Sequence, residues 1–241
     1  MTAFPTFLSV IRHVESRLNM HILTFEYEIL SELYHYDMRT ARELAATCRA
    51  SSTAFFTILK KLEASGIIGS VPDEADKRYR RYHISDDAMK AIDQFNVLIS
   101  QWMISKLENS DTFANAYCNY IYNIKEKINI RVNTCEYQII MYLYDRHHLT
   151  NIEFNNIVDV SVTKFNRSLK NLEEMGLIYS ERNHEDKRSK LYHLSDQTKQ
   201  IIDEAHMLML SWKNPQETSP ELGKLRANIA DIPFSLASPV K

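Results

Sequence analysis

The chain has 241 residues, of which 44% are hydrophobic and 25% are charged, and its formal net charge is −2. This length and composition are typical of a globular protein with one or two domains. Because the net charge is close to zero, any basic surface that binds nucleic acid or a membrane has to be local.

The cysteines and glycines exclude further classes of site. Cys48, Cys118 and Cys135 share neither spacing nor repeat position, which argues against a disulfide framework or a zinc site. The chain has only four glycines, whereas phosphate-binding loops need several closely spaced ones. No run approaches the roughly 20 apolar residues of a membrane span, and the N-terminus lacks the pattern of a signal peptide. We therefore expect a cytoplasmic protein with no membrane partner, no metal and no cofactor.

The chain is an internal duplication. Shifted by 110 residues, 24–102 lies over 134–212 without a gap, and 29 of these 79 positions are identical. This period is the length of a domain and too long for a solenoid unit. We expect a first domain at 1–108, a second at 109–213 and a mostly irregular tail at 214–241.

Each copy begins with helices. Apolar residues recur at helical spacing over 7–22 and 117–132. Second helices should start at Thr24 and Thr134, which are suitable N-cap residues with an acid in the first turn. Short third helices should follow, because Thr-x-x-Glu, the sequence of a capping box, occurs at 40–43 and again at 150–153.

A winged helix follows in each copy. Fourth helices should run from Ser51 to Gly66 and from Ser161 to Gly176, which makes a helix-turn-helix with the short helix before them. Strands are expected at 67–71 and 79–84, and at 177–180 and 190–194, around polar turns. Serines at 85 and 195 should start a final long helix that carries a tryptophan, at 102 or 212. The expected fold class is mainly α with small β wings: tandem, duplicated winged helix-turn-helix domains.

Several of these features together resemble the MarR family. They are the segments LEASGII (62–68) and LEEMGLI (172–178), the Asp-x-Arg of each wing, and the hydroxyl residue that starts the last helix. Two copies in one chain are similar to the two-domain SarA-type members. The resemblance covers about residues 5–213 and implies a transcriptional regulator that binds double-stranded DNA. It also implies that long terminal helices join the copies into a pseudo-dimer within one chain, with a higher oligomer left open.

The outward faces of the two fourth helices are candidate readers of the major groove. Arginine can read guanine and asparagine can read adenine through paired hydrogen bonds. The alternative for such a face is simple solvation. The candidates are Ser51, Thr53, Phe56, Thr57 and Lys60 in the first copy, and Ser161, Thr163, Lys164, Asn166, Arg167 and Lys170 in the second.

The two wings are the second candidate contact. An acid two residues before an arginine in a tight hairpin can brace the guanidinium, and such an arginine suits a narrow minor groove. The family resemblance implies this role for Arg78 and Arg188. Three further cations suit phosphate contacts: Arg80, Arg81 and Lys190. The candidate residues are Asp76, Lys77, Arg78 and Arg80 in the first wing, and Asp186, Lys187, Arg188 and Lys190 in the second.

Other functions stay open at this stage. The chain could be a winged-helix module that binds proteins and has lost DNA binding, or a regulator with a small-molecule effector in a cleft beside the DNA-binding parts. No catalytic constellation is visible, so we expect no enzyme. Cys48 could sense oxidants, although a buried structural thiol is the more common case. His83 and His193 should be structural, and His148 has no cysteine or acid partner at ligand spacing.

Overall fold

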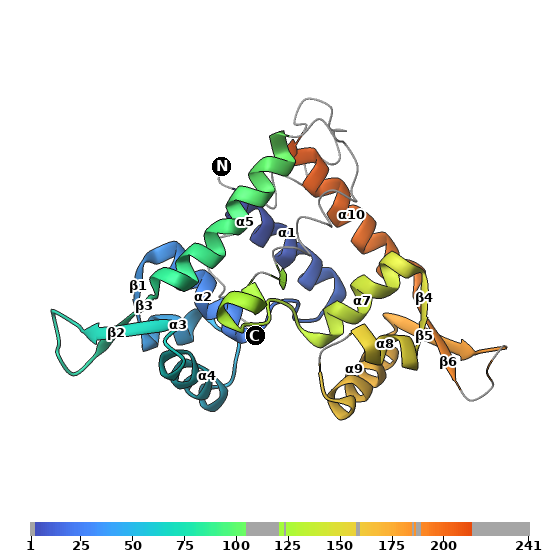
Figure 1. The fold of residues 1–241 in the computed structure, drawn as a ribbon, viewed down its shortest axis with the longest axis horizontal. Coiled ribbons are helices and arrows are strands. Elements are labelled where there is room, and N and C mark those ends of the chain that lie inside the picture. Colours follow the sequence, from blue (N-terminus) through green and yellow to red (C-terminus); the bar gives the residue numbers. More distant parts are fainter. Residues whose placement is uncertain are drawn as a thin grey trace. The chain divides into compact units, whose positions relative to one another are not determined.

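The computed structural model describes residues 3–104, 121–122, 124–157, 160–184, 186 and 189–213 (Figure 1). The chain forms two compact units, of which unit 1 includes Leu23–Val132 and unit 2 includes Val10–Ile22 and Asn133–Arg226. The predicted irregular tail lies outside the described residues. Within them, no helix is both long enough and apolar enough to cross a membrane.

Unit 1 holds the winged helix of the first repeat. Its elements are α2 (Phe25–Tyr36), β1 (Met38–Thr40), α3 (Ala41–Thr47), α4 (Ser52–Ala64), β2 (Ile68–Pro72), β3 (Arg80–Ile84) and α5 (Asp86–Ile104). The strands form an antiparallel sheet in the order β1-β3-β2, in which Ile68 lies opposite Ile84. The β2–β3 hairpin projects away from α4 (Figure 1).

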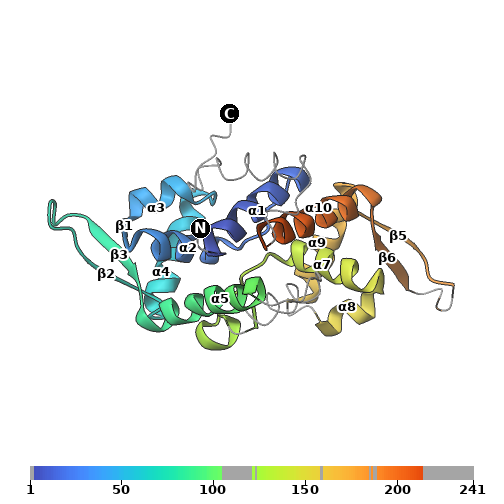
Figure 2. The same ribbon diagram turned by 90° about the horizontal axis from the view of Figure 1, so that it is seen from above.

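Unit 2 repeats this order. Its elements are α7 (Cys135–Arg146), β4 (His148–Thr150), α8 (Asn151–Ile157), α9 (Val162–Glu174), β5 (Ile178–Arg182), β6 (Lys190–Leu194) and α10 (Asp196–Lys213). The sheet order is β4-β6-β5, and the β5–β6 hairpin projects away from α9 (Figure 2). The predicted winged helices are therefore confirmed in both copies. Sequence reasoning missed the short third strands, β1 and β4.

Each repeat is preceded by a leading segment, residues 10–22 before Thr24 and residues 124–132 before Thr134. Each leading segment belongs to the compact unit of the other repeat. In unit 1 the backbone N–H of Thr24 donates to the carbonyl of Val132 at 2.9 Å, and in unit 2 that of Thr134 donates to Ile22 at 2.8 Å. Each threonine hydroxyl also donates to the carbonyl one residue earlier. Most of α1 (Ala3–Leu18) accordingly belongs to unit 2. The compact units cross the repeat boundary, and the division into two sequence domains stays a prediction about the repeats.

The helix ends form where the cap residues predicted them. The hydroxyl of Thr40 accepts the N–H of Glu43, whose carboxylate in turn accepts the N–H of Thr40 at 2.7 Å. Thr150 and Glu153 make the same two bonds. In both boxes the bond from the threonine N–H is the main cause of a lowered glutamate pKa. The capping boxes are thus confirmed, and each holds its short helix at a fixed start.

The helices α4 and α9, called the recognition helices below because each is the second helix of a helix-turn-helix, pack through one apolar stripe each. Phe55, Leu59 and Leu62 of α4 are all buried, as are their equivalents Phe165, Leu169 and Leu172 of α9. In unit 2 the Phe165 ring lies against Phe154 with the ring centroids 5.5 Å apart. Burial of such side chains contributes roughly 1.5–3 kcal/mol each. This stripe sets which residues of each helix face outward.

Unit 1 also contains a buried ion pair that unit 2 cannot form. Glu28 of α2 has no exposed surface, and its carboxylate lies 2.6 Å from Nη2 of Arg49 in the turn after α3. The second repeat has Gln138 at the position of Glu28. The pair joins α2 to the turn of the first helix-turn-helix.

We expect Arg49→Ala to lower the free energy of unfolding by about 3 kcal/mol, because it takes the guanidinium away from a carboxylate shielded from water. The control is Arg42→Ala, since Arg42 is exposed on α3 and should contribute less than about 0.5 kcal/mol. Urea unfolding followed by circular dichroism measures both. Equal stability of the two variants would contradict the role of the pair.

Gly66 and Gly176 end the recognition helices with φ of 70° and 69°, a conformation that β-branched residues resist. Nothing lies within 4 Å of where a Cβ would sit at either glycine, so only the backbone opposes substitution. We expect Gly66→Val and Gly176→Val each to cost about 1–2 kcal/mol, and Gly66→Asn to cost less. Thermal unfolding tests this, and valine variants that melt like the parent would show that the helix ends are misplaced.

Candidate nucleic-acid interface

Both recognition helices start at a serine that caps the first turn. Oγ of Ser51 accepts the N–H of Ala54 at 3.4 Å, and Oγ of Ser161 accepts that of Lys164 at 3.3 Å. Both serines are exposed. Each hydroxyl oxygen is therefore already used within the chain, while its proton stays available to a ligand such as a phosphate.

The outward face of α4 is only partly polar. Thr53, Thr57 and Lys60 are exposed, and the Thr57 hydroxyl donates to the carbonyl of Thr53 at 2.9 Å. Phe56 lies between them with 46% of its surface exposed, edge-on to Phe55. This face offers one flexible cation and an apolar ring.

The predicted contact residues of α9 are all polar or basic. All of its predicted contact residues are exposed: Thr163, Lys164, Asn166, Arg167 and Lys170. Lys170 lies 3.6 Å from Glu174, one turn later on the same helix. Within the described part of the chain, no hydrogen bond or ion pair holds the side chains of Asn166 and Arg167. These two groups can therefore bond a base edge without first breaking a contact.

The first wing contains the predicted arginine brace. Nη2 of Arg78 lies 2.6 Å from Oδ2 of Asp76, Nε lies 3.0 Å from Oδ1, and the arginine side chain is 85% exposed. These bonds lower the pKa of Asp76 and raise that of Arg78. The brace holds the guanidinium at the wing tip and leaves it open to a ligand.

Two further arginines of this wing are held against the protein. Nε of Arg80 donates to the hydroxyl of Ser70 at 2.7 Å, and the same hydroxyl donates to Glu63 of α4. Arg81 pairs with Asp73 at 2.8 Å. Lys77 is exposed at the tip. Most of the positive charge of the first wing is thus balanced by a neighbouring carboxylate.

The second wing is only partly described. Lys187 and Arg188 lie outside the described residues, so the predicted brace from Asp186 is not seen. Asp186 and Lys190 are exposed. In the strand register of the hairpin, Lys190 of β6 lies opposite Arg182 of β5. Sequence reasoning missed Arg182, although extending the predicted strand pairing by two residues would have placed it opposite Lys190.

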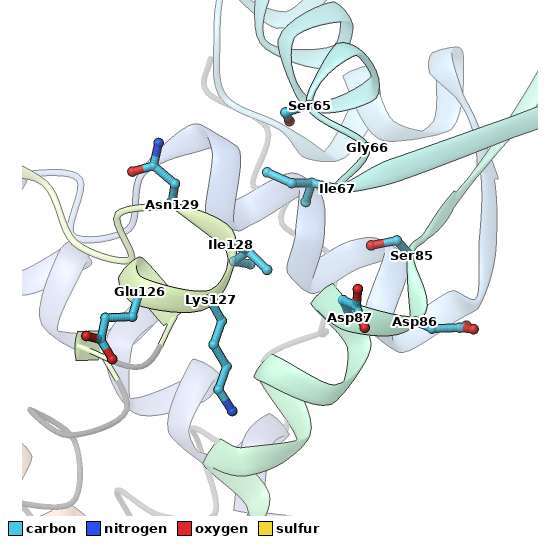
Figure 3. Close-up of a pocket in the computed structure, with 10 residues that line it drawn as sticks. All are labelled: Ser65, Gly66, Ile67, Ser85, Asp86, Asp87, Glu126, Lys127, Ile128 and Asn129. Atoms are coloured by element: carbon cyan, nitrogen blue, oxygen red, sulfur yellow. The ribbon is translucent and has the colours of Figure 1, made fainter.

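A hollow of about 420 Å³ lies in unit 1 beside the end of α4 (Figure 3). Its walls come from 65–67, 85–87 and 126–129, so one wall belongs to the segment from the second repeat. Ile67 and Ile128 lie on opposite sides, and Asp86 and Asp87 lie at the start of α5. The hollow is a candidate for the effector cleft that the sequence left open as an alternative.

Cys48 is a buried thiol at the end of α3. Burial is the main cause that raises its pKa to about 11, and the nearby Glu28 carboxylate raises it further. A thiol with this pKa is protonated at neutral pH, so it is a poor nucleophile towards oxidants. The geometry favours the structural role.

Comparison with solved structures gives matches of low identity. AbfR of Staphylococcus epidermidis is 23% identical, with 49% of this chain and 88% of that one covered and a TM-score of 0.30. A mutant MarR from E. coli is 17% identical, with coverages of 56% and 90% and a TM-score of 0.30. A mutant ZitR from Lactococcus lactis is 21% identical, with coverages of 53% and 94% and the same TM-score.

Family comparisons separate the two repeats. No curated protein gives a significant match. The model described as MarR family matches residues 25–79, and the one described as Transcriptional regulator SarA/Rot matches residues 119–205. Both are families of DNA-binding transcription regulators rather than enzymes. The first repeat is thus similar to the MarR family and the second to SarA/Rot regulators, and each match covers less than half of the chain.

Proposed function

We propose that one chain acts as a pseudo-dimeric, sequence-specific regulator of transcription in the cytoplasm, binding double-stranded DNA through both winged helices. The observation that supports this most is that both repeats contain the same arrangement of helix and hairpin. In each repeat a capped, solvent-facing recognition helix lies beside a hairpin that carries four basic and three acidic residues, counted over 70–85 and over 180–195. A catalytic role has no such support.

In this proposal α4 and α9 enter the major groove and the wings reach the minor groove. A helix can read base edges there through the side chains that its buried stripe leaves outward. The braced guanidinium of Arg78 suits a narrow minor groove, where the negative potential is strongest. We assign the same role to Arg188, and phosphate contacts to Arg80, Lys190 and Arg182.

The two repeats should read different sequences. Identical subunits read a palindrome, because each half-site meets the same side chains. Here Phe56 and Thr57 stand where Asn166 and Arg167 stand in the second repeat. A phenylalanine offers only apolar contact, for instance with a thymine methyl, whereas asparagine and arginine can each make paired hydrogen bonds. We propose two unlike half-sites about one helical turn apart, with repeat two supplying more of the base specificity.

Regulation by an effector is a second proposal, which rests on the hollow in unit 1. A ligand wedged among 65–67, 85–87 and 126–129 would contact the glycine end of α4 and the start of α5. Binding of the ligand would thereby change the position of the recognition helix α4 relative to α5. The volume of the hollow is in the range of small-molecule sites.

We expect Arg78→Ala to weaken DNA binding by about 1–3 kcal/mol while the protein stays folded, because this side chain is almost fully exposed. Arg188→Ala should act similarly. Arg78→Lys keeps the charge but loses the paired bonds to Asp76, so it should fall between the parent and the alanine variant. Lys90→Ala is the control, since Lys90 is an exposed cation on α5. Fluorescence anisotropy at fixed salt measures affinity, and unchanged binding in both alanine variants would remove the wings from the interface.

We expect the double variant Asn166→Ala, Arg167→Ala to relax sequence preference more than the double variant Phe56→Ala, Thr57→Ala. The first loses paired hydrogen bonds to base edges, whereas the second loses only weaker contacts. Selection of bound fragments from a random DNA pool, followed by footprinting, compares the two. A strictly palindromic footprint that responds equally to both double variants would refute the assignment of unlike half-sites.

A further inference from the structure

Two histidines and a glutamate form a cluster on the sheet of unit 2. The strand register places His148 of β4 directly opposite His193 of β6, and their ring centroids lie 5.8 Å apart. Nε2 of His193 lies 3.1 Å from Oε1 of Glu181 of β5. Each strand of the sheet therefore contributes one side chain to the cluster.

The first repeat keeps one of the three residues. His83 is the equivalent of His193, but Met38 stands at the position of His148 and Val71 at that of Glu181. The sheet of unit 1 nevertheless forms with the same strand order. The second histidine and the carboxylate are thus not needed to build the sheet.

The cluster is accessible and partly fixed in place. His148 is exposed, the Glu181 side chain is 53% exposed and that of His193 is 19% exposed. The ring of Tyr179 stacks on His193 with centroids 5.0 Å apart and planes inclined by 15°. This stack holds the plane of the His193 imidazole while Nε2 stays near the carboxylate.

Two imidazoles and a carboxylate are the protein ligands of many open zinc sites, in which water takes the fourth position. Zn–N bonds of about 2.0–2.1 Å place two ring centroids roughly 5 Å apart. The two imidazoles, whose centroids lie 5.8 Å apart, therefore have to approach by less than about 1 Å. The ligand atoms of all three residues do not yet lie within 4.8 Å of one another. The exposed His148 therefore has to turn towards His193 when an ion binds.

We propose that His148, His193 and Glu181 bind a divalent transition-metal ion, for which zinc fits the ligand set best. Imidazole nitrogens favour zinc over magnesium or calcium, which take oxygen ligands. The bound ion cross-links β4, β6 and β5 and stiffens the base of the second wing. The site was hidden in the sequence because its three ligands are brought together only by strand pairing. It does not depend on DNA binding.

The test is calorimetric titration of the metal-free full chain with Zn²⁺. The cluster variants are His148→Gln, His193→Gln and Glu181→Gln, and the control is His184→Gln, an exposed histidine of the same hairpin. We expect the parent and the control to share a zinc site that each cluster variant loses or binds at least about tenfold more weakly. Zn²⁺ should also raise the unfolding temperature of the parent but not of His148→Gln, and Mg²⁺ should give no binding heat.

The metal-free unfolding temperatures of the variants separate loss of the site from loss of folding. His148→Gln changes an exposed side chain and should unfold like the parent without metal. No zinc binding by the parent, or equal binding by the parent and all three cluster variants, would overturn the proposal. Loss of binding in the His184→Gln control would overturn it as well, because the ligands would then be misassigned.

Discussion

The constraint on which the interface depends is the fixed extent of the recognition helix. Both α4 and α9 have 13 residues, with a serine cap before them and a glycine of positive φ after them. The apolar stripe then fixes the rotation of each helix about its axis. With length and rotation both set, each position along the helix points in the same direction in the two repeats. A substitution on the outward face therefore changes the chemical group at that position but not the direction in which the group points.

Features determined by nearby residues could be predicted from the sequence. The capping boxes, the glycine ends, the buried stripes and the brace between Asp76 and Arg78 all depend on residues within a few positions of one another. The wing strands were placed to within about two residues. The DNA contacts themselves remain predictions, because they require a partner molecule.

Features that depend on distant residues could not be predicted. The strands β1 and β4 have three residues each and form only because β3 and β6 pair with them. The ion pair of Glu28 joins residues that are 21 positions apart, and sequence periodicity carries no sign of it. The histidine cluster required the pairing of three strands. The exchange of leading segments was hidden for the same reason.

That exchange has a consequence for how the chain acquires its structure during synthesis. Protein domains generally fold as units from the N-terminus as they leave the ribosome. Unit 1 lacks the segment that bonds to Thr24 until residue 132 has been made, and residues 10–22 wait for Thr134. Neither unit is complete when the first repeat has emerged, and both depend on contacts across more than one hundred residues. Such distant contacts slow folding. The duplicated chain therefore passes through a long interval of synthesis in which neither unit is complete.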